Sequence, residues 1–457
     1  MTNPLEQLIV RLWNGATRPA PPAVPGVRLG SVVSDSGVFT EACRLPHAQR
    51  PTHVAILGRT GTGKSSLLRA LTAQDIRQDL GFVHLDLHGE TTPHVLRLLA
   101  REEQRRRMDL SDRVIVIDPA DPHWSVGVNV LATRADASRM SQIADMVQIL
   151  KQRWQLDALG ARTEELVRNS LVVLADAQLT LLELAPLLTH DTFRQQCLRT
   201  TRSADVRAYF ETRYDPSSAA MQATWREAVL NKISAFTTDD RFRHLVGQRD
   251  PRVSILDALD RGAWVLVNLD KGRLGEHATT LGSLLLTQIR HALFARTQRT
   301  LVTIYADELQ NLVAYDSGID TMLSEARKYG VGICAANQFL DQYPAAIRAA
   351  MLAVGTHMFF QLSGPDADRI AAILGGGHHL RDRLRNLPPR TAIVKRGTAA
   401  WQQIRVPDVT TPATDPTDLL RRSRERWART RTAIEQDIAR RLPPAPPPPP
   451  EVLDDWE

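Results

Sequence analysis

The sequence of 457 residues predicts an α/β fold, in which a mainly parallel sheet is interrupted by an inserted all-alpha domain. Two observations support this. Short β-rich runs alternate with amphipathic segments before residue 136 and after residue 250, whereas the stretch between shows only leucine-rich helical periodicity. Strands that are apolar on both faces and separated by helices are typical of a parallel sheet covered on both sides.

Seven runs are predicted as strands of this sheet: HVAIL at 53, FVHLD at 82, VIVID at 114, AWVLVNL at 263, LVTIYA at 301, VGICAA at 331 and HMFFQL at 357. Helical periodicity is clearest in RTEELVRNSLVVLADAQ and WREAVLNKISAF. We therefore assign residues 28–135 and 251–407 to the sheet domain and residues 136–250 to the all-alpha domain.

Both ends differ in character from the middle. Residues 1–27 combine an amphipathic helix, NPLEQLIVRLW, with the Pro-rich linker RPAPPAVPG. Residues 408–457 combine one strongly basic helix, LLRRSRERWARTRTAIEQDIARRL, with a polyproline run and an acidic tail. We expect this helix to lie across an adjacent subunit or to recruit a partner. For the last residues, the simplest expectation is disorder.

The composition favours a protein of the reducing cytoplasm. The three cysteines are far apart without metal-ligand spacing, and no apolar run approaches the roughly 20 residues of a membrane-spanning helix. No signal peptide is visible, so we expect a cytoplasmic protein that partners could hold at the inner face of a membrane. The net charge of +6 is compatible with a polyanionic partner and equally with a solvated surface.

The strongest motif is GRTGTGKSS, which follows one predicted strand and precedes a helix, as a phosphate-binding loop requires. Its glycines let the backbone wrap an anion with N–H groups at the amino end of the helix. We predict ATP as ligand, with Lys64 on the β and γ phosphates and Ser65 on Mg²⁺. The alternative is a flexible glycine turn. The predicted nucleotide-binding residues are Gly58, Arg59, Thr60, Gly61, Thr62, Gly63, Lys64, Ser65 and Ser66.

Two adjacent carboxylates end the predicted strand at 301. Such a pair is costly at the rim of a core unless a cation meets it. We predict that Asp307 holds the Mg²⁺ shell of the phosphate loop on the neighbouring strand and that Glu308 orients or deprotonates the attacking water. The alternative is a simple helix cap after a strand.

Two further polar groups fit the same chemistry. Gln338, with Asn337, follows the strand at 331 and is placed to sense the γ-phosphate, although a strand-end amide without function is the alternative. Arg327 of SEARKYG could serve a neighbouring subunit as an arginine finger, and an ordinary surface pair with Glu325 is its alternative.

The ordered set of motifs resembles the TraG/TraD-like type IV coupling proteins of the HerA/FtsK superfamily of DNA-pumping ATPases. The resemblance rests on HVAILGRTGTGKSSLL, LDLHGE, IDPADP with VNVL, LVNLDKGRLGE, YADELQNL, SEARKYGVGICAANQ and GPDADRIAAILG, in order between about residues 28 and 406. It implies a RecA-like P-loop ATPase domain interrupted by an all-alpha domain, and a hexamer that threads DNA through a central channel. It assigns Gly63, Lys64 and Ser65 to the nucleotide, Asp307 and Glu308 to metal and water, Gln338 to sensing and Arg327 to the trans finger.

The sequence departs from membrane-anchored members because it shows no transmembrane helix, and from HerA because only about fifty residues precede the loop. The leading hypothesis is an ATP-driven DNA translocase resembling a soluble coupling protein for conjugative transfer. The alternatives are a motor in DNA repair or phage defence, and a nucleotide-switched docking platform for a relaxase. Lys271 and Arg273, in a glycine-containing loop after a strand, are the candidate DNA contacts, with a solvated turn as the alternative. Duplex and single-stranded DNA both stay open.

Overall fold

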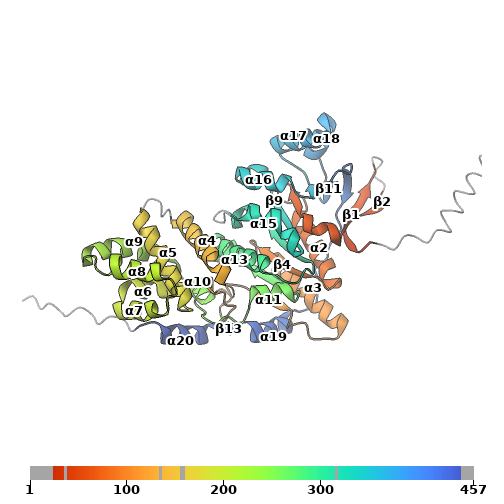
Figure 1. Cartoon of the computed structure of the whole chain (residues 1–457). Helices are drawn as coiled ribbons and strands as arrows, with labels where there is room; N and C mark the ends of the chain where they lie inside the picture. Colours follow the sequence, from red (N-terminus) through yellow and green to blue (C-terminus); the bar gives the residue numbers. More distant parts are fainter. Residues whose placement is uncertain (1–23, 35–38, 133–135, 155–159, 314–317, 444–457) are drawn as a thin grey trace, which may run out of the picture.

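One large sheet organises the molecule (Figure 1). The computed structural model describes residues 24–34, 39–132, 136–154, 160–313 and 318–443. Eleven strands follow the order β2-β1-β12-β11-β10-β3-β9-β8-β4-β7-β5. The predicted N-terminal helix with most of its linker, and the polyproline run with the acidic tail, lie outside the described residues.

All seven predicted strands are present, and they form the parallel part of the sheet. They are β3 (Val54–Leu57), β4 (Gly81–Asp86), β5 (Val114–Ile117), β7 (Trp264–Asn268), β8 (Val302–Asp307), β9 (Val331–Asn337) and β10 (Thr356–Phe359). Four strands that the sequence analysis did not identify extend the sheet in antiparallel fashion beyond β10. They are β1 (Gly26–Val33), β2 (Phe39–Pro46), β11 (Thr391–Arg396) and β12 (Gln402–Arg405). The predicted α/β class with a mainly parallel sheet is confirmed.

Helices cover both faces of the parallel strands because successive side chains of each strand point to opposite faces. On β4, Phe82 packs in one cluster with α2 (Lys64–Arg77) and α3 (Thr91–Arg106). Val83 and Leu85 pack in a second cluster with helices of the opposite face. These are α11 (Ile255–Asp260), α13 (His277–Phe294), α15 (Ile319–Glu325) and α16 (Ala345–Leu352).

Shorter elements connect the strands. They are η1 (His47–Thr52), α12 (Lys271–Leu274), α14 (Leu309–Leu312), η5 (Ala326–Tyr329), η6 (Leu340–Gln342), α17 (Gly364–Ile373) and α18 (Gly377–Arg385). The last two pack together over β10 and β11 in a third hydrophobic cluster. None of the helices within the described ranges combines the length and apolarity that crossing a bilayer requires.

The described residues between β6 (Trp124–Ser125) and α11 contain helices and no strand, and Figure 1 shows them gathered beside the sheet. They are α4 (Asp136–Trp154), α5 (Ala161–Asp176), η3 (Leu181–Glu183), α6 (Leu184–Thr189), α7 (Asp191–Thr200), α8 (Ala204–Tyr209), η4 (Phe210–Tyr214), α9 (Ala219–Thr237) and α10 (Asp240–Val246). One hydrophobic cluster runs from the sheet into these helices. The division into domains at residues 136 and 250 therefore stays a prediction.

The C-terminal segment corrects the prediction of one basic helix. The described part contains two helices, α19 (Thr417–Trp427) and α20 (Arg431–Arg441), separated by the short strand β13 (Arg429–Thr430), which pairs with β6. Thr430 caps α20 by accepting a hydrogen bond from the Ala433 N–H at 3.3 Å. The interruption separates two helices with different neighbours: α19 packs on β5 and α20 on α10. We call residues 417–441 the C-terminal strap.

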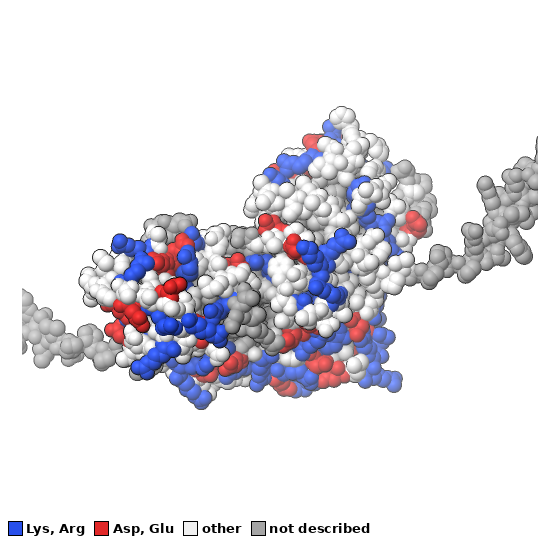
Figure 2. All heavy atoms as spheres, in the orientation of Figure 1, with Lys and Arg blue, Asp and Glu red and all other residues white. Residues whose placement is uncertain are grey.

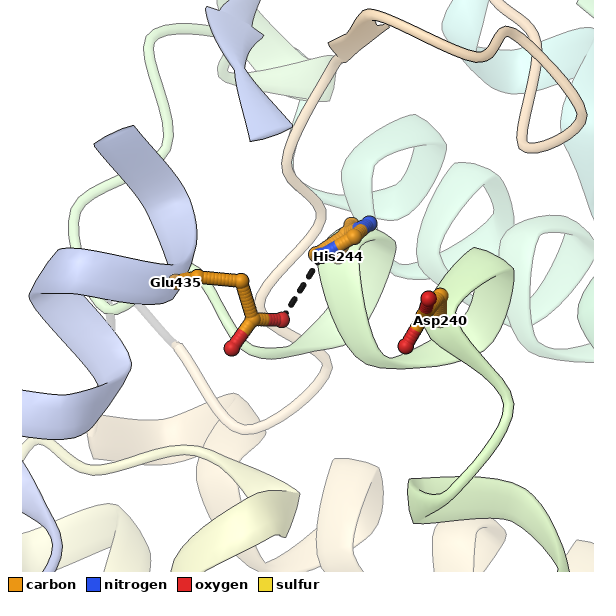
Figure 3. Close-up of side chains that lie close together, drawn as sticks. All are labelled: Asp240, His244 and Glu435. Carbon is orange, nitrogen blue, oxygen red and sulfur yellow. Dashed lines mark hydrogen bonds and ion pairs between the residues drawn. The ribbon is translucent and has the colours of Figure 1, made fainter. Parts of the chain in front are cut away.

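The strap is held by apolar contacts and by ion pairs. Ile434 and Ile438 of α20 are fully buried. Glu435 approaches His244 at 2.7 Å and Arg243 at 3.0 Å, and Figure 3 shows the Glu435 carboxylate reaching from α20 to the imidazole. Asp240 lies one helical turn from His244 on α10. Because a guanidinium already faces Glu435, this cluster is an ion-pair clasp between the two helices.

Candidate functional site

The phosphate loop joins β3 to α2 in a conformation that depends on glycine. Gly61 and Gly63 have φ values of +76° and +115°, a region that other residues rarely occupy. Gly63 is the N-cap of α2, so the free N–H groups of the first helical turn point toward the space above the loop. All nine predicted nucleotide-binding residues lie in this loop and the first turn of α2.

Lys64 is buried, with its ammonium group turned onto its own loop. Its Nζ donates to the carbonyl oxygens of Gly58 at 2.7 Å and Arg59 at 3.1 Å. Burial lowers the pKa of Lys64, and the nearby carboxylates of Asp307 and Glu308 act in the opposite direction. A buried ammonium group that is bound only by neutral carbonyls can gain strongly from an anion.

Ser65 and Asp307 meet, although 242 positions separate them in the sequence. Ser65 Oγ donates to Asp307 Oδ2 at 2.6 Å, and Asp307 is almost fully buried at the end of β8. One detail of the prediction is wrong: β8 is not the neighbour of β3, because β9 lies between them. The carboxyl ends of these three parallel strands share one edge, and this brings the two side chains together.

Glu308 follows Asp307 in a left-handed conformation, with a φ of +56°. Such a backbone is strained for a residue with a side chain and is common at functional sites. Two amides hold the Glu308 carboxylate: Gln338 Nε2 donates to Oε1 at 3.0 Å and Asn311 Nδ2 donates to Oε2 at 2.8 Å. The predicted sensor Gln338 is thus hydrogen-bonded to Glu308, the residue predicted to activate water.

Asn337 has a different environment from Gln338. Its side-chain amide donates to the Phe339 carbonyl at 2.8 Å, and its own carbonyl accepts from the Gly58 N–H. It therefore shapes the turn and the start of the phosphate loop.

Arg327 does not join this group. It is exposed in η5, which precedes β9, whereas Gln338 follows the same strand. A strand of seven residues spans about 20 Å, so Arg327 cannot act on the phosphate loop of its own chain. Its side chain has no hydrogen bond or ion pair to a described residue. The surface pair expected in this segment is made by Lys328 and Glu325, at 2.5 Å.

The two candidate DNA contacts both face groups of their own chain. Lys271 Nζ lies 3.9 Å from Glu308 Oε2, and Arg273 Nη1 lies 3.5 Å from Asp118 Oδ2. Arg273 Nη2 also donates to the Ala120 carbonyl at 2.5 Å. Neither side chain is buried, so contact with DNA stays a prediction for both.

Sequence reasoning missed three residues beside the site. One is Asn311, whose side-chain amide donates to Glu308 Oε2. His88 lies in LDLHGE, with its Nε2 3.4 Å from Glu308 Oε1. Arg390 contacts the phosphate loop from between α18 and β11. The sequence does contain a signal for His88, because this residue follows a predicted strand, and the carboxyl end of that strand lies at the same edge of the sheet as the site. No local signal exists for Arg390.

The donor set fits a nucleoside triphosphate with Mg²⁺. Free N–H groups and a buried ammonium group suit the phosphates, and a hydroxyl beside a carboxylate provides the oxygen ligands that Mg²⁺ prefers. A carboxylate held by two amides lies next to these ligands, where it could accept a proton.

Comparison with known proteins agrees with this geometry. The family model described as the central domain of the helicase HerA matches residues 29–289, more than half of the chain. No curated protein sequence matches the chain.

Several solved structures share the fold. The unbound bacterial conjugative coupling protein TrwB has 17% identity and a TM-score of 0.54, covering 89% of this chain and 93% of its own. TrwB with ADP and Mg²⁺ has 17% identity and a TM-score of 0.53, covering 86% and 98%. VirB4 of Thermoanaerobacter pseudethanolicus has 15% identity and a TM-score of 0.57, covering 84% and 97%.

Proposed function

Since this chain belongs to the family of the helicase HerA central domain, we propose that it is an ATP-hydrolysing DNA translocase that works as a hexamer. The chain is a P-loop ATPase, as its family and its phosphate loop indicate. The observation that supports this proposal most directly is the contact of Ser65 with Asp307 at 2.6 Å. It lies beside a Glu308 carboxylate that two amides orient.

Each residue of the site has a distinct task in this proposal. Lys64 would bind phosphate oxygens in place of its two loop carbonyls, and Ser65 and Asp307 would hold Mg²⁺. Glu308 receives the proton of the attacking water, and Gln338 positions that water or senses the terminal phosphate. Bound ATP with Mg²⁺ supplies the phosphoanhydride bond whose cleavage provides the free energy.

Assembly with neighbouring subunits is proposed for a geometric reason, and the number six follows from the resemblance to ring-forming DNA pumps. Arg327 lies at the opposite end of β9 from the site and is free to reach a neighbouring molecule. An arginine supplied by another subunit would neutralise charge that develops during phosphoryl transfer, and hydrolysis would then depend on assembly. Lys271, which lies 3.9 Å from Glu308, and Arg273, which lies 3.5 Å from Asp118, would link the site to DNA through backbone phosphates.

The name and ligands of TrwB support the coupling-protein version of this function. TrwB is a conjugative coupling protein, and one of its structures contains ADP and Mg²⁺. We propose that this chain likewise moves DNA for a type IV secretion system, on the cytoplasmic side, with a relaxase or secretion components as partners. A motor in repair or defence and a nucleotide-switched platform for a relaxase are the alternatives.

The ATPase rate of the purified protein with and without DNA tests the proposal. A translocase is stimulated by DNA, whereas a switch or platform need not be. Particle images with an ATP analogue and DNA provide the second test. A closed six-membered ring around DNA is expected, and a stable monomer indifferent to both ligands would overturn the proposal.

A further inference from the structure

Arg390 is joined to the phosphate loop through its backbone. Its N–H donates to the Thr62 carbonyl at 2.7 Å, and its own carbonyl accepts from the Val406 N–H at 2.8 Å. Its φ is +62°, a left-handed conformation that is unfavourable for a residue with a side chain. Strained backbone of this kind persists where the surroundings fix it, and it clusters at ligand sites.

The side chain of Arg390 starts at the amino end of α2. A Cβ atom on Gly63 would lie 3.0 Å from Arg390 Cα and 3.1 Å from its Cγ, so glycine leaves the space that this side chain fills. Gly63 caps the helix whose first N–H groups face the predicted phosphate position. The guanidinium is three bonds beyond Cγ, and it can therefore be directed over this helix end.

In this structure, the guanidinium is bound to a carboxylate. Arg390 Nη1 lies 2.6 Å from Asp408 Oδ2, and the Asp408 side chain is three-quarters exposed. Exposed ion pairs of this kind are weak because water competes for both partners. A phosphate group offers the same fork geometry to an arginine as a carboxylate does, with more charge.

We propose that Arg390 is a further nucleotide-binding residue, whose guanidinium leaves Asp408 and binds the phosphate chain at the amino end of α2. This inference rests on the proposed ATPase function. Arg390 belongs to the same chain as the loop that it serves, in contrast to Arg327. Asp408 is its internal competitor, occupying the guanidinium until the nucleotide arrives.

The opposite effects of two substitutions test the proposal, with binding of fluorescent methylanthraniloyl-ADP and Mg²⁺ as the readout. Arg390→Ala should weaken binding about tenfold, because a charge-assisted phosphate contact is lost. Asp408→Asn should tighten it about two- to fivefold, because the competing carboxylate is gone. In the double variant, the effect of Asp408→Asn should disappear, since the guanidinium it would release is absent.

A matched exposed pair provides the control. Arg421 and Asp418 of α19 form an ion pair at 2.8 Å far along the sheet from the phosphate loop, and Arg421→Ala and Asp418→Asn should leave nucleotide binding unchanged. If the unmodified protein does not bind the nucleotide, the proposed function itself fails. If it binds, and Lys64→Ala abolishes binding while Arg390→Ala does not weaken it, the role of Arg390 alone is overturned.

Folding of the variants is checked by circular dichroism. Should Arg390→Ala not fold, Arg390→Lys and Asp408→Asn carry the test, because they keep the positive charge. Lysine lacks the fork and should bind the nucleotide more weakly than arginine. If Asp408→Asn leaves nucleotide binding unchanged or makes it weaker, the inference is overturned.

Discussion

The phosphate loop and the C-terminal strap are both rich in cations, but they use them differently. In the strap, arginines face carboxylates of other elements: Arg422 binds Glu103 at 2.7 Å, and Arg424 and Arg441 pair with Asp121 and Glu183. Figure 2 shows basic and acidic side chains interspersed along the edge where Figure 1 places α19 and α20. At the loop, Lys64 has only carbonyl partners.

This difference separates structural cations from those available to a ligand. A strap arginine already paired with a buried carboxylate stabilises the packing of α19 and α20, and its charge is satisfied. The buried ammonium of Lys64 donates its hydrogen bonds to neutral carbonyls, with the carboxylates of Asp307 and Glu308 near it, so an anion that it contacts directly improves its environment. The number of cations in a region therefore says less about binding of a polyanionic ligand than the partner of each cation does. A cation that is already paired with a carboxylate is less available than one that contacts only carbonyl groups.

The largest expected effect is that of Lys64→Ala. Removing the ammonium leaves the phosphate cradle without its buried charge, so nucleotide binding should weaken strongly and turnover should fall by roughly a thousandfold or more, as for other groups that neutralise charge in phosphoryl transfer. Titration with fluorescent nucleotide and a steady-state ATPase assay check this. If Lys64→Ala binds nucleotide as tightly as the unmodified protein, the phosphates must be bound elsewhere.

Glu308→Gln should separate binding from turnover. The amide keeps the size of the side chain and can still accept a hydrogen bond from one of the two amides that hold Glu308, but it cannot accept a proton, so hydrolysis should slow by about a hundred- to a thousandfold. Nucleotide affinity should stay within about threefold of the unmodified protein because the phosphate ligands are intact. An equal loss of affinity in this variant and in Lys64→Ala would contradict the role assigned to Glu308.

Ile438→Ala should act on stability and leave the site intact. Ile438 is fully buried on the inner face of α20, beside Gly247. Its truncation should reduce the free energy of unfolding by about 2–5 kcal/mol. Urea unfolding measures this, with Gln436→Ala on the exposed face of α20 as control. Loss of nucleotide binding in the folded variant would show that strap and loop are coupled.

The smallest effect is expected for Arg421→Ala. Both partners of the Arg421–Asp418 pair are exposed, so the melting temperature should not change measurably. Differential scanning calorimetry checks this. A clear loss of stability would mean that the strap depends on its surface pairs as well as on its buried side chains.

The sequence predicted what short-range patterns encode. Seven strands and the phosphate loop were identified because apolar runs and glycine spacing are local, and Asp307 was placed near Ser65 because parallel strands end at one edge. The break of the strap at β13 was missed because the strongly basic periodicity continued past Thr430, whose capping role was the only local signal.

Other features depend on contacts across the chain. Arg390 meets Thr62 after more than three hundred residues, and nothing near it predicts a left-handed arginine. The antiparallel strand β1 pairs with β12, which brings together residues from the two ends of the sheet domain. Such pairings are set by tertiary packing and leave only weak marks in the sequence.

Displacement of a third strand from a DNA triplex tests the central claim most directly, because it requires both hydrolysis and movement along the duplex. The unmodified protein with ATP and Mg²⁺ should release the third strand, whereas Glu308→Gln with the same ligands should hold ATP and release none. Release by Glu308→Gln at the unmodified rate, or hydrolysis by the unmodified protein with no release from any DNA substrate, would contradict a translocase driven from this site.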